Sequence, residues 1–293
     1  MTLAAQRLSE ATHTSRSAVR ARGHSEPDLL VVRRYYQPGP HPRRTSAVDT
    51  VILAGARVRP GQDLIALNPA PRLLSGALSA VCPGGSVTLL APAPAALAQI
   101  RPTPENRYRW GSVWDATELP LPGASADAVI GRTVLAPLGH PRRVLIDIAR
   151  VLRPGGRLSL CEPLLGQRSP IGLDGLKQHE LTQAAKVLAG VQPAAHAFTV
   201  PYAVGNARLA GLTHIEHLTD TVTTRLTGVA AAEAALHAPG PAGESVYQAI
   251  NRSLGAAFAR RYADAWRATA RRRPIVLTTP IVYLIAVKPD TRT

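Results

Sequence analysis

Histidines are the side chains of this chain best suited to acid–base or metal chemistry. His140 stands before Pro141 in a loop, where it could exchange a proton near neutral pH or cap the helix that follows. His214 and His217 flank Glu216 in an expected strand. Because side chains alternate along a strand, His217 lies on the face opposite the other two, and we expect no shared metal ion. Three more are expected to be solvated or hydrogen-bonded: His179, His196 and His237.

The two cysteines, Cys82 and Cys161, lie far apart in apolar surroundings, and neither belongs to a CxxC motif. They could form a bridge, but buried reduced thiols fit a cytoplasmic chain better. We assign them no chemistry.

The net charge of +15 comes almost entirely from arginine, since only three of the 34 basic residues are lysines. The compact clusters are Arg33-Arg34, Arg43-Arg44, Arg142-Arg143 and Arg271-Arg272-Arg273. A solvated face or an acidic protein partner explains such clusters as well as phosphate does, and 4% aromatic residues supply little material for base stacking. Nucleic-acid binding is therefore not favoured.

Composition and length predict a globular chain that positions its functional residues on one large domain. With 293 residues and 45% hydrophobic content, the chain can bury an ordinary core. No apolar run reaches the ~18 to 20 residues of a membrane span, and the amino terminus is charged, so we expect a cytoplasmic protein without membrane contact. We expect a flexible arm over 1–28, one domain over 29–289 and a tail over 290–293.

Short apolar runs alternate with helical patterns along the first half of the chain. Strands are expected at 63–67, 86–90, 108–113, 127–131 and 157–162, and helices at 45–56, 73–81, 95–100 and 142–152. This alternation predicts an α/β fold with a doubly wound parallel sheet covered on both faces. Gly155-Gly156 are expected to form the left-handed cap that ends the last of these helices.

Helical additions are expected within 171–200 and 226–273, with helices over 171–189 and 244–271. The second helix has an apolar residue every four positions: Val246, Ile250, Leu254, Phe258, Tyr262 and Trp266. Such a stripe is typical of a lid over a hydrophobic small molecule or of an oligomer interface. Between and after the additions, 213–222 is expected to be a strand, and 274–289 a pair of strands joined around Thr279-Pro280.

The segment from Trp110 to Pro163 resembles the class I S-adenosylmethionine (SAM) methyltransferases of quinone and natural-product biosynthesis. The resemblance rests on these residues: Asp115, Leu119-Pro120, Asp127, Leu152-Arg153-Pro154-Gly155-Gly156 and Glu162-Pro163. It implies a Rossmann-like seven-stranded sheet, mostly parallel with an antiparallel C-terminal strand, and helical lid additions. It also implies that Asp115 contacts the adenine of SAM, and it puts His140 close to a position where family members often have a substrate-facing histidine.

The same alignment puts other residues where the family binds SAM. The acid of the first strand is replaced by Ala66, and the three glycines of the following loop by Asn68, Ala70 and Arg72. Ala91 stands where the family has the acid that binds both ribose hydroxyls. A register error is the alternative explanation, but no GxG occurs between Val51 and Leu90. The sequence therefore predicts an eroded SAM site in which Asp115 is the retained anchor.

Three functions follow from these observations. The first is a non-catalytic accessory subunit that pairs, as a homo- or hetero-oligomer, with an active methyltransferase of small-molecule (secondary-metabolite) biosynthesis. The second is an enzyme, either an atypical SAM-dependent methyltransferase or a SAM-independent catalyst acting on a small hydrophobic substrate, for which His140 is the weak catalytic candidate. Recognition of nucleic acid comes third.

Overall fold

The computed structural model describes residues 33–34, 47–91, 108–110, 118–138, 140–191, 198–238 and 244–290. The expected arm over 1–28, the helix over 95–100 and the last three residues of the strand over 108–113 lie outside these residues. The strands are β1 (Arg33–Arg34), β2 (Asp63–Leu67), β3 (Ser86–Leu90), β4 (Tyr108–Trp110), β5 (Ala126–Arg132), β6 (Leu152–Pro163), β7 (Ser169–Ile171), β8 (Thr213–Leu226) and β9 (Ile275–Val287). The helices are α2 (Ala47–Ala56), α3 (Pro71–Val81), α5 (Pro141–Val151), α6 (Gln178–Val191), α8 (Val200–Leu209), α9 (Val229–His237), α10 (Val246–Leu254) and α11 (Ala256–Arg272), with a 3-10 turn η1 (Leu165–Gln167).

One sheet runs through the molecule in the order β1-β4-β3-β2-β5-β6-β9-β7, and β8 pairs with β9. Strands β4, β3, β2, β5 and β6 are parallel to one another, whereas β9 is antiparallel to β6, β7 and β8. The predicted doubly wound α/β sheet with an antiparallel C-terminal strand is confirmed.

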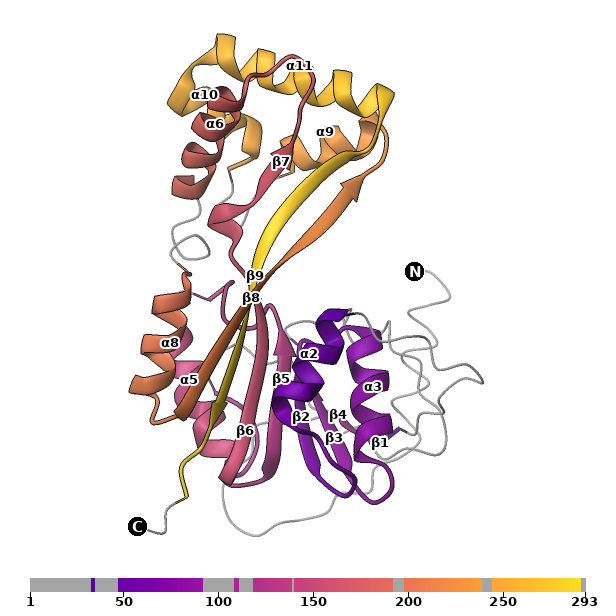
Figure 1. Ribbon diagram of the computed structural model, residues 1–293, viewed down its shortest axis with the longest axis vertical. Coiled ribbons are helices and arrows are strands. Elements are labelled where there is room, and N and C mark those ends of the chain that lie inside the picture. Colours follow the sequence, from indigo (N-terminus) through magenta and orange to yellow (C-terminus); the bar gives the residue numbers. More distant parts are fainter. Residues whose placement is uncertain are drawn as a thin grey trace, which may run out of the picture.

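Helices cover both faces of the lower sheet (Figure 1). On one face, α2 and α3 pack against β2, β3 and β5 through residues such as Ile52, Leu74 and Ile130. On the other face, α5 and α8 share a second core with β6 and β9, which includes Ile148 and Leu284. The near-continuous apolar strands of the sequence are those buried between these two layers.

The C-terminal run forms one strand, not the expected pair joined at Thr279-Pro280. The change of partner along β9 explains why a proline is tolerated: β6 pairing ends at Ile281, and β7 pairing begins at Thr278. The carbonyl of Pro280 accepts a hydrogen bond from Leu164 N–H at 2.8 Å. A strand residue's N–H points the same way as its carbonyl, so the missing donor falls in the gap between the two partner strands.

The upper part of the molecule is a helical cap built from α6, α9, α10, α11, β7 and the distal ends of β8 and β9 (Figure 1). The helix expected over 244–271 is split, because Gly255 has a φ of +84° between α10 and α11. The apolar stripe packs within the cap's own core, where Ile250, Tyr262 and Trp266 are buried. The helix expected over 171–189 begins only at Gln178, since β7 occupies its start.

The end of α5 also differs from the prediction. Its C-cap is Leu152 in extended conformation, and the left-handed Gly155 lies three residues further on. Gly155 N–H donates to the carbonyl of Lys288, and Lys288 N–H donates to that of Gly156, both at 2.9 Å. The glycine pair therefore ties the start of β6 to the end of β9.

Candidate functional site

The strand order reverses direction between β2 and β5, so the crevice outside their carboxyl ends is the expected ligand position of the sheet. Leu67, the last residue of β2, pairs with Leu90 of β3 on one side and with Gly131 of β5 on the other. Asn68 and Ala91 follow β2 and β3, and Arg132 is the last residue of β5, so all three lie at the same edge of the sheet. The resemblance places SAM here.

Asn68 spans this crevice. Its backbone N–H donates to the carbonyl of Leu90 at 2.7 Å, and its side-chain Nδ2 reaches the carbonyl of Arg132 at 3.0 Å and that of Thr133 at 3.5 Å. Asn68 and Thr133 both have left-handed φ, +45° and +53°. Asparagine tolerates that conformation, but a β-branched threonine is strained in it. The chain thus holds two unusual backbone conformations to join the ends of β2 and β5.

Gly131 of β5 is closely packed against its neighbours at this edge. A Cβ on Gly131 would lie 2.6 Å from Val134 Cγ2 and 2.8 Å from the carbonyl oxygen of Leu67. Such contacts are too short for any real side chain. The glycine therefore allows close packing between β2 and the loop after β5.

The other substituted positions offer no group for SAM. Ala66 and Ala91 are buried, with 0% and 1% of their surface exposed. Ala70 is the N-cap of α3 but supplies no side-chain cap, Pro71 removes a first-turn donor, and Arg72 is exposed. From Leu64 to Pro104 the sequence contains no Asp or Glu. None of the five substituted positions therefore carries a carboxylate.

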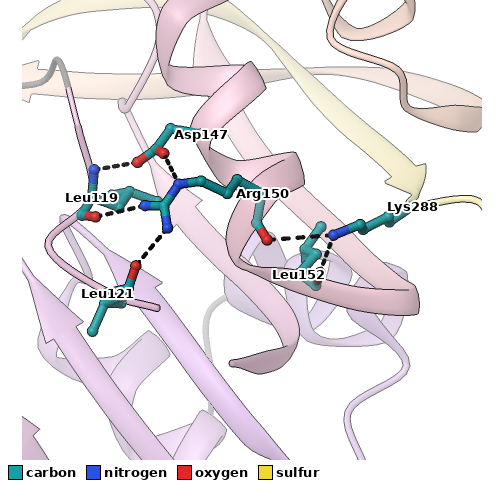
Figure 2. Close-up of polar contacts among 6 residues, drawn as sticks. All are labelled: Leu119, Leu121, Asp147, Arg150, Leu152 and Lys288. Carbon is teal, nitrogen blue, oxygen red and sulfur yellow. Dashed lines mark hydrogen bonds and ion pairs between the residues drawn. The ribbon is translucent and has the colours of Figure 1, made fainter. Parts of the chain in front are cut away.

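Asp115 lies outside the described residues, but the segment that follows it is firmly held (Figure 2). Asp147 of α5 accepts from Leu119 N–H and from Arg150 Nε. The guanidinium of Arg150 donates to the carbonyls of Leu121 at 2.7 Å and Leu119 at 2.9 Å. This clamp fixes the residues immediately downstream of the expected adenine contact.

The Leu-Arg-Pro-Gly-Gly motif acts at the opposite edge of the sheet. Arg153 bridges Asp127 at 2.6 Å and Asp63 at 2.8 Å, and hydrogen bonds to these two carboxylates raise the pKa of its guanidinium. Asp63 and Asp127 stand at the amino ends of β2 and β5. This part of the family resemblance therefore maintains the sheet and lies away from the ligand edge.

Arg132 is a site residue that the sequence analysis missed. Its carbonyl receives the Asn68 amide, and its guanidinium pairs at 3.2 Å with Asp49 of α2, which is 1% exposed. Cys161 lies in the same neighbourhood, and burial raises the pKa of its thiol to about 12. A thiol of that pKa is not a nucleophile at neutral pH. The signal in the sequence that could have identified Arg132 was its position as a charged residue at the carboxyl end of an otherwise apolar strand.

Glu162 organises the loop after β5. It is fully buried and accepts hydrogen bonds from Val134 N–H at 2.8 Å, Leu135 N–H at 3.0 Å and Ala136 N–H at 2.9 Å. Burial raises the pKa of its carboxyl to about 7, although the three backbone donors oppose that shift. The Glu-Pro motif therefore positions backbone, and its carboxylate is engaged within the protein.

The histidines that the structure describes do not form a metal or catalytic centre. His140 is exposed at the N-cap of α5, where its side chain makes no capping hydrogen bond. His214 has a φ of +46° within a bulge of β8, so the expected alternation of His214 and Glu216 is interrupted there; both are exposed, as is His217. His196 lies outside the described residues, and His179 and His237 belong to α6 and α9 of the cap. Among described residues, no group of three His, Cys, Asp or Glu side chains could hold a metal ion.

Two further findings concern chain-wide expectations. Cys161 is buried as expected, but Cys82 is exposed, because it is the C-cap one residue beyond the buried end of α3. Within the described segments, no helix is both long and apolar enough to cross a bilayer.

The strand order and the paired helices define a class I methyltransferase-type fold. Residues 73–160 match the family model of the methyltransferase domain (Methyltransf_11). Among solved structures, a protein of Anabaena variabilis assigned to the methyltransferases of an antibiotic biosynthesis pathway has 15% identity and a TM-score of 0.50, covering 82% of this chain and 97% of that one. A Bacillus halodurans protein assigned as a methyltransferase has 12% identity and a TM-score of 0.49, covering 82% and 98%.

A curated relative is an uncharacterized 37.1 kDa protein of transposon TN4556 from Streptomyces fradiae, 34% identical over 116 residues. The match covers 39% of this chain and spans about a third of that relative's length, 34%.

Proposed function

We propose that this chain is a methyltransferase-fold protein that does not use SAM and serves as a non-catalytic accessory subunit of an active methyltransferase in small-molecule biosynthesis. The observation that carries the proposal is the Asn68 side chain, which joins the ends of β2 and β5 where the family's glycine loop would leave room for the cofactor. Ala91 adds to it, because a buried methyl group cannot bind ribose hydroxyls.

Loss of the ribose-binding acid alone should lower the affinity for SAM by a measurable amount. A hydrogen bond to a charged acceptor contributes ~1.5 to 3 kcal/mol, equivalent to about one to two decades of affinity. Loss of the glycine loop adds a steric cost, since the amide of Asn68 would have to leave two carbonyl acceptors before the methionine end of SAM could enter. In this proposal, the one adenine contact expected from Asp115 does not compensate for the SAM affinity lost with the ribose acid and the glycine loop.

Unfolding in the presence of SAM tests the cofactor part. A ligand present at 100 times its Kd stabilises the folded state by ~2.7 kcal/mol. We expect about 1 mM SAM to leave the urea midpoint of the wild type unchanged. The double variant Asn68→Gly/Ala91→Asp, which removes the bridging amide and returns the acid, is the matched comparison and should gain SAM affinity relative to wild type. Stabilisation of the wild type by more than about 1.4 kcal/mol at 1 mM SAM, which corresponds to a Kd below about 100 μM, would refute the proposal.

A second candidate function is a SAM-independent enzyme acting on a small hydrophobic molecule. It is favoured by the ion pair between buried Asp49 and half-buried Arg132, which lies near Cys161. Co-purification separates the two functions: the accessory subunit is recovered with a second methyltransferase and raises that enzyme's activity, whereas the enzyme converts a substrate alone.

A further inference from the structure

Strand β8 has one long open edge. Its 14 residues pair with β9 from Thr213 to Leu226, and among the residues that the structure describes no strand pairs with its other side. Most of its side chains are exposed, including Leu218 at 54%. Figure 1 shows β8 running from beside α8, across β9 at the middle of the molecule, to the cap.

From Glu216 to Leu226 this edge has no proline, lysine or bulge, and its charged residues are Glu216, Asp220 and Arg225. Exposed edges are commonly protected by proline, lysine, bulges or short length. Thr213–Leu226 contains no proline or lysine, and its one register irregularity lies between Thr213 and Glu216. From Glu216 onward, 11 consecutive residues keep a regular ladder with β9, about 36 Å of strand at ~3.3 Å per residue.

The charges of β8 are sorted by face. Glu216 and Asp220 pair with Ile285 and Ile281 of β9. These two isoleucines lie on the face of the sheet that α2 covers, because Ile281 belongs to the core that includes α2 and Ile285 contacts Gly55 of α2.

His217 pairs with Leu284, which belongs to the core under α5 and α8. Arg225 falls on the same face as His217, because it lies eight residues away. One face of the open edge is therefore acidic and the other basic.

A second copy of this chain does not complement that pattern. Two β8 edges extended into one antiparallel sheet are related by a two-fold axis perpendicular to the sheet, so the same faces of both copies adjoin. No register of 216–226 then puts an acid of one copy opposite a base of the other. Like charges directly opposite each other destabilise strand pairing.

From this open edge, resting on the accessory role proposed above, we propose that β8 is the partner-docking strand of this protein and that it accepts by sheet extension a strand of a different polypeptide. That strand carries basic residues on the face of Glu216 and Asp220 and an acid on the face of Arg225. Backbone hydrogen bonds supply the affinity, and the two charge sets select the partner and its register.

A pair of cyclic β-hairpin peptides tests this surface, since their strands are already ordered. In the matched peptide a ten-residue antiparallel strand has Glu at position 1, opposite Arg225, and Lys at positions 6 and 10, opposite Asp220 and Glu216. The other peptide has these charges exchanged. Fluorescence anisotropy measures binding, and hydrogen exchange measures protection of the 216–226 amides. With three pairs of ~0.2 to 1 kcal/mol each, we expect the matched peptide to bind at least about tenfold more tightly.

The variant Glu216→Lys/Asp220→Lys should reverse the preference, while Glu118→Lys/Asp290→Lys, an equal charge change at exposed positions elsewhere, should keep it. Absence of binding, binding without protection of 216–226, or equal affinity for both peptides would overturn the proposal. A wild-type dimer in sedimentation that shields the same amides would overturn it in favour of a second copy. None of these readouts involves SAM, so this result and the test of SAM binding can fail independently.

Discussion

Replacing Asn68 by aspartate changes the bridge between β2 and β5 with almost no change in shape. In the wild type, the Nδ2 donor lies 3.0 Å from the Arg132 carbonyl and 3.5 Å from that of Thr133. Aspartate places an acceptor against these two acceptors. The loss combines a net hydrogen bond of ~0.5 to 1.5 kcal/mol with ~1 to 3 kcal/mol for polar groups left unpaired, and we expect a total of about 2 to 3 kcal/mol.

Asn68→Gly is the control for that change. It loses the same side-chain bond, but glycine adopts the φ of +45° without strain, so we expect a cost below about 1 kcal/mol. Urea denaturation of the three proteins gives both free energies of unfolding. If Asn68→Asp were as stable as the wild type, the amide would not join the two strands in solution, and the explanation for SAM exclusion would be wrong.

Two other changes probe the surroundings of this edge, and a third probes the opposite edge of the sheet. Gly131→Ala should cost ~1 to 3 kcal/mol of unfolding free energy, since its Cβ meets Val134 and Leu67. Adding Val134→Ala should restore only part of the lost stability. If Gly131→Ala had no effect on stability, the close packing at this edge would be wrong. Glu162→Gln should cost ~2 to 3 kcal/mol because the amide NH2 group replaces one carboxyl oxygen and faces backbone N–H donors, which lose their acceptor. Burial raises the pKa of Glu162 in the folded protein to about 7 from 4.5. Its pH-dependent contribution to the free energy of unfolding is therefore complete below about pH 4.5 and is lost as the pH rises to about 7. The stability of the wild type relative to Glu162→Gln should fall across that window, and a rise would contradict the assigned shift. Lys288→Met should cost ~1 to 2 kcal/mol, as Nζ donates to the carbonyls of Leu152 at 2.6 Å and Arg150 at 3.3 Å at the end of α5 (Figure 2), whereas exposed Lys186→Met should be neutral in the same urea titration.

The sequence was sufficient for the parallel part of the fold because its strands are short apolar runs between periodic helices. The predicted strands 63–67 and 86–90 agree with β2 and β3 residue for residue. The C-terminal ribbon was harder to predict, because proline normally interrupts a strand. Only the tertiary position of Pro280, between the partner strands β6 and β7, removes that objection. Likewise, a single helix was expected over 244–271 because the four-residue apolar spacing continues across Gly255.

At the candidate site, the sequence indicated which residues were replaced but not what they do. Asn68 could be identified as a substituted glycine position, whereas its contact with the Arg132 carbonyl joins residues 64 positions apart. The role of Glu162 depends on three backbone donors of a loop 26 to 28 positions away, for which the Glu-Pro motif contains no signal. The fate of Asp115 stays a prediction.

Isothermal titration calorimetry of the full chain with SAM and with S-adenosylhomocysteine tests the proposed loss of SAM binding most directly. The account predicts no saturable heat with a Kd below about 100 μM, or about −5.5 kcal/mol of binding free energy, because the ribose acid and the glycine loop are both missing. A Kd below that value for either compound would contradict it.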